Sequence, residues 1–238
     1  GGADLKYALA SNLTLDVTVN PDFGQVEADP ARVNLTAFES FYPERRPFFQ
    51  EAADLFDFRL SLDDGEDDLE TLFYSRRVGR QPQGYTPGDA RFASPSEQTT
   101  ILGAAKISGR TASGWSVGLL SAATARETAR TVADQPGAAG ALVEARAEYS
   151  VVRVVRDLRR GRSAVGLIGT GVVRDGGDAE ALGVPSASLA AGVDFRHRFG
   201  GDRYQLWGWV VASRVQGSKE AIARLQTSPV HLFQRPDA

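Results

Sequence analysis

The sequence contains neither cysteine nor methionine, and its only histidines are His197 and His231. The absence of cysteine excludes disulfides, thiolate metal sites and cysteine nucleophiles. The absence of methionine removes the initiator, and the chain, which starts Gly1-Gly2-Ala3, does not open on a signal peptide. The end of the chain, 234–238, has no obvious terminator. We therefore expect a mature protein or a piece cut from a longer one.

Three other features are also missing. The formal net charge is only −3 over 238 residues, and no basic stripe follows the chain, so we expect no nucleic-acid partner. No apolar run reaches the roughly 18 residues that a membrane-spanning helix needs. No glycine loop of the kind that cradles phosphate is present, and we expect neither a cofactor nor a metal.

Alternation of apolar and polar residues is the main pattern that is present. In 12–20, one face carries Leu13, Leu15, Val17 and Val19, and the other face is polar. A period of two over this length predicts a β-strand, and 4–10 predicts another. The pattern stops after Asn20 and resumes near Thr99. Further strands are expected near 99–110, 114–124, 142–158, 163–174, 186–199 and 204–214.

The predicted strands are long, and the connections between them alternate in length. Strands in soluble proteins usually run about five or six residues, whereas a tilted strand crosses a bilayer in roughly 9–11. Short turns on one side and long loops on the other are typical of outer-membrane barrels. A soluble β-sandwich or a lipocalin-like barrel is the alternative, because its strands alternate too. The short connections are 11–12, 111–113, 159–162 and 200–203; the long ones are 21–98, 125–141 and 175–185.

The faces of the later strands fit this pattern unevenly. In 186–199, apolar residues alternate with polar and charged ones such as Asp194, Arg196 and Arg198. In 204–214 the face opposite the apolar one carries Trp207 and Trp209. In 142–158 the phase slips, which predicts a bulge or a strand end near Ser150.

The long connection 21–98 interrupts the strands. Asp29-Pro30 predicts the start of a helix that Pro43 ends, and a second short helix is expected over 50–56. Between them lies FYPERRPFF, 41–49. An arginine beside carboxylates in an aromatic setting usually forms a structural lattice of ion pairs, here pinning a folded-in loop against a barrel wall. A binding role is the alternative. The candidate binding or plug residues are Glu44, Arg45, Arg46, Phe48 and Phe49.

Several long stretches also resemble one known family. They are LKYALASNLTLDVTVNPDFGQVEADPARVNLTAFESFYPERRPFFQEAADLF, LFYSRRVGR, ILGAAKISGRTASGWSVGLL and FQRPDA, which together extend from about Asp4 to Ala238. They resemble the bacterial family called domain of unknown function 5916. This resemblance implies an outer-membrane β-barrel of unestablished role, a segment that typically follows a secreted carbohydrate-binding module of family 9.

The sequence departs from the family pattern in two ways. The carbohydrate-binding module is absent, so sugar binding is not carried over to this chain. We also expect the later strands of the family to be missing, which makes this chain part of a larger barrel. An open half-barrel would leave unpaired edges that a membrane does not tolerate.

Four constellations could carry chemistry, and each has a simpler explanation. The motif 114–118 matches G-x-S-x-G, but it opens a strand after a hairpin, whereas the nucleophile elbow needs a strand, a sharp turn and a helix. The acidic run 63–68 misses the EF-hand spacing and is expected to be a solvated loop. The arginines of 75–80 and 156–162 could bind phosphate, although charged residues at a periplasmic turn are the simpler interpretation. A glycosidase would need two carboxyls across a cleft, and the sequence places no two of Glu39, Glu44, Glu51 and Asp54 together.

The sequence therefore predicts an all-β fold: an antiparallel, up-and-down transmembrane β-barrel, or a fragment of one, with 1–238 as a single domain and 21–98 as a partly helical lumen plug or long-side loop. The expected location is the bacterial outer membrane, with membrane lipid as partner and carbohydrate only through the absent module. We expect a passive pore, uptake or surface component rather than an enzyme. The alternatives are an envelope carbohydrate-active enzyme and a soluble β-rich binding module. Charged residues expected to line an aqueous lumen are Asp16, Lys106, Asp194, Arg196 and Arg198.

Overall fold

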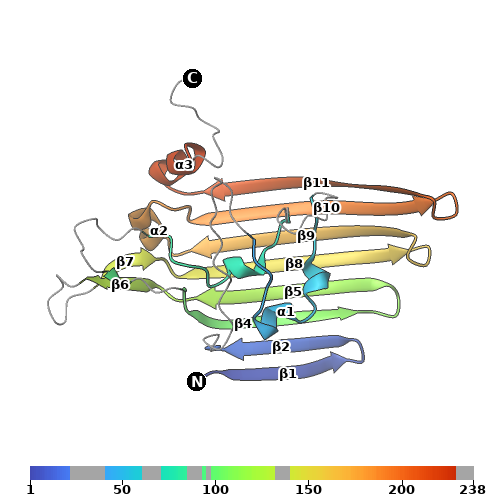
Figure 1. Ribbon diagram of the computed structural model, residues 1–238, viewed down its shortest axis with the longest axis horizontal. Helices are drawn as coiled ribbons and strands as arrows, with labels where there is room; N and C mark the ends of the chain where they lie inside the picture. The colour runs from blue at the N-terminus through green and yellow to red at the C-terminus, as the bar shows by residue number, and fades with distance from the viewer. Residues whose placement is uncertain (22–40, 61–70, 85–92, 95–97, 132–139, 229–238) are drawn as a thin grey trace.

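One broad antiparallel sheet dominates the computed structural model (Figure 1). The structure describes residues 1–21, 41–60, 71–84, 93–94, 98–131 and 140–228. Each strand of the sheet pairs with its neighbour in the up-and-down order β1-β2-β4-β5-β8-β9-β10-β11. The strands are β1 (Ala3–Ala10), β2 (Leu13–Val19), β4 (Ile101–Arg110), β5 (Trp115–Thr124), β8 (Ala147–Leu158), β9 (Ser163–Arg174), β10 (Ala187–Phe199) and β11 (Tyr204–Gln216).

The predicted all-β class and the positions of the long strands are confirmed, with one error. The expected strand over 142–158 is two strands, β7 (Ala141–Glu144) and β8, and the break lies at 145–146 rather than near Ser150. β8 continues through Ser150 without a register shift, and it is β7 that leaves the main sheet. It pairs with β6 (Glu127–Thr131), and β6 pairs with β3 (Ala93–Ser94), in a small second sheet.

The two ends of the main sheet differ. Tight turns join β1 to β2, β4 to β5, β8 to β9 and β10 to β11, all at the right-hand end in Figure 1. The turn 159–162 needs a left-handed backbone at Arg159, Arg160 and Gly161. The small sheet and the helices α2 (Gly176–Leu182) and α3 (Lys219–Gln226) lie at the other end. The alternation of short and long connections that the sequence predicts is therefore present.

Helix α2 lies within a connection that the sequence analysis treated only as a loop. Its first turn is capped by the Asp175 carboxylate, which accepts from the backbone N–H of Asp178 at 3.0 Å. Gly183 ends it in the left-handed conformation that suits glycine. An N-cap aspartate and a following glycine were visible signals for this short helix.

The two faces of the main sheet differ in chemistry. One face, here called the outer face, is apolar across the sheet: Val117, Val154, Leu167, Val193 and Val210 form one row of paired neighbours. Most of these side chains are exposed, Val210 by 75%. The opposite face, here called the covered face, carries Asp16, Lys106, Arg153 and Asp194, and it lies under the segments 41–60 and 71–84.

These two segments, here called the insertion, hold short helical turns. They are α1 (Pro47–Gln50), η1 (Ala53–Phe56) and η2 (Ser75–Arg77). The predicted helix over 50–56 is therefore misplaced: α1 ends at Gln50, and Ala52 has a left-handed backbone that separates α1 from η1. The helix predicted from Asp29-Pro30 lies outside the described residues.

Glycines in the sheet allow the insertion to approach closely. A Cβ at Gly118 would lie 2.9 Å from the Phe56 ring, and one at Gly192 would lie 2.7 Å from the Phe58 ring. Both phenylalanines are almost completely buried. The main hydrophobic core therefore lies between the insertion and the covered face. Its buried members are Phe49, Phe56, Val78, Ile101, Ala104, Leu120, Ala122 and Val151.

The described strands form an open sheet and not a closed barrel, with β1 and β11 at its two edges. The expected antiparallel, up-and-down arrangement is present, while closure is not observed. Within the part of the chain that the structure describes, no helix is long and apolar enough to cross a membrane.

Candidate functional site

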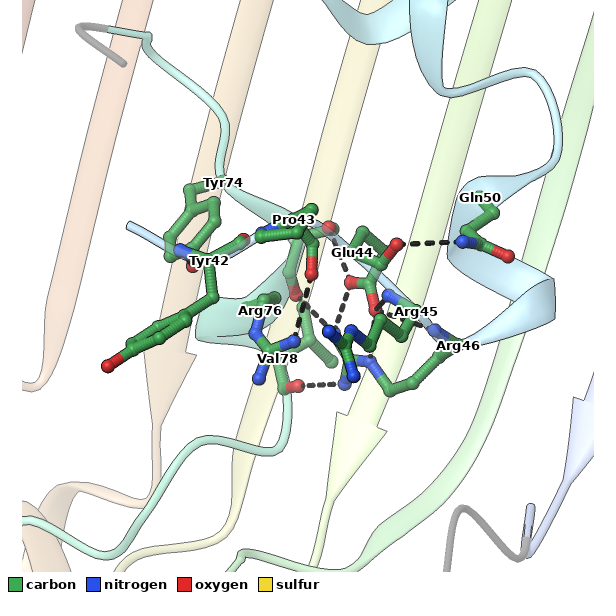
Figure 2. Close-up of polar contacts among 10 residues, drawn as sticks. Tyr42, Pro43, Glu44, Arg45, Arg46, Gln50, Tyr74, Arg76 and Val78 are labelled. Atoms are coloured by element: carbon green, nitrogen blue, oxygen red, sulfur yellow. Dashed lines mark hydrogen bonds and ion pairs between the residues drawn. The ribbon is translucent and has the colours of Figure 1, made fainter. Parts of the chain in front are cut away.

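The segment FYPERRPFF is organised around the Glu44 carboxylate (Figure 2). Its Oε1 accepts hydrogen bonds from the backbone N–H groups of Arg45, at 3.0 Å, and Arg46, at 2.9 Å, and from Arg46 Nε at 2.8 Å. Its Oε2 accepts from Arg46 Nη2 and from Ser75 Oγ, each at 2.6 Å. Pro43 and Pro47 bracket these residues and hold the backbone in the turn that makes this possible.

Arg46 joins the two segments of the insertion. Its Nη1 donates to the carbonyl of Val78 at 2.6 Å, and its Nη2 donates to the carbonyl of Ser75 at 2.9 Å. The guanidinium also lies 4.2 Å from the centre of the Phe49 ring. Burial raises the pKa of Glu44, but the bonds from Arg46 and Ser75 outweigh that effect and hold the pKa below its usual value. Glu44 is therefore ionised at neutral pH.

Aromatic and amide groups extend this lattice on both sides. The Tyr74 hydroxyl donates to the Tyr42 carbonyl at 3.0 Å and accepts from the Tyr42 N–H at 2.9 Å. Arg76 donates to the carbonyl of Pro43, and Gln50 donates to the carbonyl of Glu44. The side chains of FYPERRPFF are thus largely used within the insertion, as expected of a structural lattice.

Lys106 ties the insertion to the sheet. Its Nζ donates to the carbonyls of Phe48, at 2.6 Å, and Glu51, at 2.7 Å, and the side chain is 1% exposed. Asp16 on β2 lies 3.9 Å from the same nitrogen. A second contact joins Lys6 to the Glu51 carboxylate at the edge of the insertion. Among the candidate lumen residues, Lys106 and Asp16 are therefore covered by the insertion.

A charged cleft opens beside the insertion, toward the tight-turn end of the sheet. Its volume is about 500 Å³. On its wall, Arg153 and Asp194 form a two-pronged ion pair, with Nη1–Oδ1 at 2.5 Å and Nη2–Oδ2 at 3.0 Å. Side chains of both signs and a tryptophan line the cleft, among them Asp54, Asp57, Arg110, Asp157, Arg196 and Trp207.

The structure separates the candidate lumen residues into three places. Asp194 and Arg196 line the charged cleft, whereas Asp16 and Lys106 lie beneath the insertion. Arg198 is exposed nearer the tight turns, where it donates to Gln205 at 3.4 Å. The sequence analysis missed Arg153 and Arg110 as cleft residues. The alternation of β8 puts Arg153 on the same face as Asp157, so the sequence could have predicted the face of Arg153. It could not have predicted that Arg153 pairs with Asp194 on β10.

The geometry gives little support to the two catalytic alternatives, a serine hydrolase and a glycosidase. Ser116 of the G-x-S-x-G motif accepts from Arg110 Nε at 2.9 Å within a continuous strand, so no nucleophile elbow forms. His197 instead contacts Ser163, with Nδ1 2.9 Å from Oγ. Of the carboxylates considered for glycoside hydrolysis, Glu44 and Glu51 form ion pairs, with Arg46 and Lys6 respectively, and Asp54 lines the cleft.

Some candidates fall outside the described residues: Glu39, His231 and the acidic run 63–68. Across the residues that are described, no group of three or more histidine, aspartate or glutamate side chains could hold a metal ion. The arginines of 75–80 lie in the insertion over the covered face, not at a tight turn. The turn 159–162 does carry Arg159, Arg160 and Arg162, as expected.

Comparison with known proteins gives one match. The model of the family described as domain of unknown function (DUF5916) matches residues 1–225. The chain belongs to the DUF5916 family. This confirms the family resemblance found in the sequence. No curated protein and no solved structure matches the chain.

Proposed function

We propose that this DUF5916 chain forms part of the wall of a bacterial outer-membrane β-barrel, with the outer face toward lipid and the covered face toward the interior. In this arrangement the insertion is a plug, and the charged cleft is part of a passive path for solutes. The observation that carries the proposal is the polarity of the sheet: its solvent-exposed face is apolar, and its protected face holds the charges.

The outer face supports a lipid environment. Monomeric soluble proteins rarely expose a contiguous apolar patch larger than a few hundred Å². Here exposed apolar side chains extend from Leu5 and Tyr7 on β1 to Leu206 and Val210 on β11, across the whole sheet. The main-sheet strands β4, β5, β8, β9, β10 and β11 have 10–13 residues, enough for a tilted crossing of roughly 9–11.

Aromatic residues gather where these strands approach the tight turns. Trp115, Phe199 and Tyr204 are exposed on the outer face at that end, and Phe199 stacks on Tyr204. The Arg156 guanidinium lies 5.0 Å from the centre of the Trp115 ring. Aromatic and basic side chains at one level are typical of the boundary between lipid and water.

The covered face supports an aqueous interior. Arginines and aspartates of both the sheet and the insertion line the charged cleft, and such a lining biases the passage of solutes by charge. We propose that further strands complete the barrel, because β1 and β11 would otherwise present unpaired backbone groups to lipid. The proposed partner is outer-membrane lipid. A link to carbohydrate handling is also proposed, on the family resemblance alone.

Tryptophan fluorescence tests the orientation of the faces. The chain has three tryptophans: Trp115 on the outer face, and Trp207 and Trp209 on the covered face. One variant, W207F/W209F, keeps Trp115; its counterpart, W115F/W207F, keeps Trp209. In vesicles with lipids brominated at shallow acyl positions, we expect strong quenching of Trp115 and little quenching of Trp209. Equal quenching of both, or of neither, contradicts the proposal.

The proposed pathway needs a separate measurement on the natural full-length protein. Isolated outer membranes should contain it as a band whose gel mobility shifts on heating. Steady conductance in planar bilayers would indicate an open interior. A shifted band without conductance would indicate that the plug closes the path, and deletion of 41–49 should then open it. Recovery in the soluble periplasmic fraction, with no shifted band, would favour a soluble module or an enzyme.

A further inference from the structure

A second pocket lies on the covered face, separate from the charged cleft and toward the end with the long connections. Its volume is about 300 Å³, at the lower end of the range for small-molecule sites. Paired strand residues form its floor, and Leu72, Phe73 and Val78 of the insertion lie opposite. The floor has two rows: Tyr149, Val172, Ser188 and Val215 in one, and Val151, Thr170, Ala190 and Ser213 in the other.

Three arginines line this apolar pocket. Arg77 and Arg80 come from the insertion, and Arg174 comes from the end of β9. Burial is the main reason that the pKa of Arg80 lies below its usual value; Arg174 and Arg77 lower it further, while Tyr149 and Glu144 act in the opposite sense. Like charges gathered in a partly buried pocket repel one another. This arrangement therefore favours a negatively charged occupant.

Several hydrogen-bond donors at the pocket have no protein acceptor. Within the part of the chain that the structure describes, neither the Arg80 guanidinium nor the Tyr149 hydroxyl makes a hydrogen bond. Arg174 donates from Nη1 to the carbonyl of Pro185 at 3.0 Å, but its buried Nε has no partner. Leaving a buried donor such as Arg174 Nε unsatisfied is costly.

The described lining of the pocket contains no carboxylate that could neutralise Arg80 or Arg174. Among the described residues that line it, none is an aspartate or a glutamate. Glu144 is near enough to affect Arg80, but it is buried outside the lining and accepts from the Gln83 N–H at 2.8 Å. Within the described lining, a bound anion is therefore needed to balance Arg80 and Arg174.

We infer that this pocket binds a small organic anion, a compact apolar body that carries one carboxylate, phosphate or sulfonate group. Arg80 and Arg174 receive the oxyanion, because a guanidinium matches its geometry with two parallel donors. The Tyr149 hydroxyl supplies a further donor. The apolar body lies between the insertion and the strand floor, against Leu72, Val151 and Val172.

The test uses two probes that differ in charge but hardly in shape: 2-naphthalenesulfonate and the neutral 2-naphthalenesulfonamide. Binding to the whole chain, refolded in detergent micelles, is measured by calorimetry after subtraction of binding to empty micelles. We expect Arg80→Gln to weaken sulfonate binding about 10-fold or more, the loss of a charge-assisted contact, with little change for the sulfonamide. Arg203→Gln, which removes an exposed arginine at the tight-turn end, is the matched control and should change neither.

A second measurement needs no variant. Inorganic sulfate should displace the sulfonate from the unmodified chain but leave sulfonamide binding unchanged. The inference is overturned if Arg80→Gln binds the sulfonate as tightly as the control, if both probes weaken equally, or if sulfate displaces neither probe. The result does not depend on the barrel, because a sheet that stays in solution would carry the same pocket.

Discussion

Val154 and Val155 are neighbours on β8, yet they lie in different surroundings. Val154 belongs to the outer face, in a row of aliphatic side chains, and Val155 lines the charged cleft beside Arg153 and Asp157. Soluble sheets place apolar side chains on the protected face and polar ones outward. The outer face of this sheet departs from that rule, because its exposed side chains are apolar. This difference between the faces is the observation on which the proposed lipid-facing orientation rests.

The largest expected effect comes from removing a charge from beneath the insertion. Lys106→Met leaves two carbonyls without their donor and Asp16 without its partner, so the unfolding free energy should fall by about 3–5 kcal/mol. Denaturant unfolding in micelles measures it. Lys6→Met, which breaks the exposed pair with Glu51, is the control and should cause no measurable change. Similar losses for both would show that burial of Lys106 contributes nothing.

Adding a charge to the outer face should be almost as harmful. Val154→Arg places a guanidinium midway along the proposed lipid-facing row, and the expected cost is about 2–4 kcal/mol in a bilayer. Its neighbour Val155→Arg faces the charged cleft and should cost much less. The yield of heat-modifiable protein in vesicles compares the two. Equal yields for the two variants would contradict the proposal that the two faces lie in different environments.

The ion-pair lattice around Glu44 should contribute less to the free energy of unfolding than Lys106 does. Glu44→Gln removes the charge that holds Arg46 and Ser75, with an expected cost of about 2 kcal/mol. Protease cleavage within 41–84 should therefore become faster while the sheet stays intact. Gln50→Ala, which removes only one neutral bond to the Glu44 carbonyl, is the milder comparison. Unchanged cleavage in Glu44→Gln would mean that the lattice does not hold the insertion in place.

The Glu44 carboxylate should also make the stability of the insertion depend on pH. The folded-state pKa of Glu44 is lowered, so its contribution is present in full above the unfolded value near 4.5 and is lost as pH falls below that value. Protease sensitivity of the insertion should rise in acid. In Glu44→Gln this part of the pH dependence should disappear, which separates Glu44 from the other carboxylates.

The smallest expected effect concerns two glycines on opposite faces. Gly118→Ala directs a methyl group into the Phe56 ring on the covered face, at an expected cost of about 1 kcal/mol or slightly more. Gly169→Ala points outward into open space and should be tolerated. Thermal unfolding of the two variants checks this. A larger loss from Gly169→Ala would mean that the outer face is packed against something.

The strands could be predicted because their signal is local. Alternation placed β9 at its observed bounds and assigned Tyr204, Leu206 and Val210 to one face, opposite Trp207 and Trp209. The break between β7 and β8 could not be located, because the chain changes its partner strand there without a proline or a glycine to mark it. The pairing of β7 with β6 shows where the break lies.

The site was less predictable than the fold. FYPERRPFF was identified as an ion-pair lattice from its composition, but its partners Ser75 and Val78 come from a segment about 30 residues later. The Arg153–Asp194 pair spans 41 residues and three neighbouring strands. Such contacts depend on sheet register, which no single segment of the sequence encodes.

The hydrogen bond between Trp209 and Leu60 constrains the order in which the parts of the molecule fold. The Trp209 indole donates to the Leu60 carbonyl at 2.9 Å across 149 residues of chain. The hairpins of the sheet pair within a few tens of residues, so they can form early, whereas the insertion reaches its last partner only when β11 is in place. The insertion is synthesised early and finishes docking late. In refolding experiments, protection of 41–84 should therefore lag behind the appearance of β-structure.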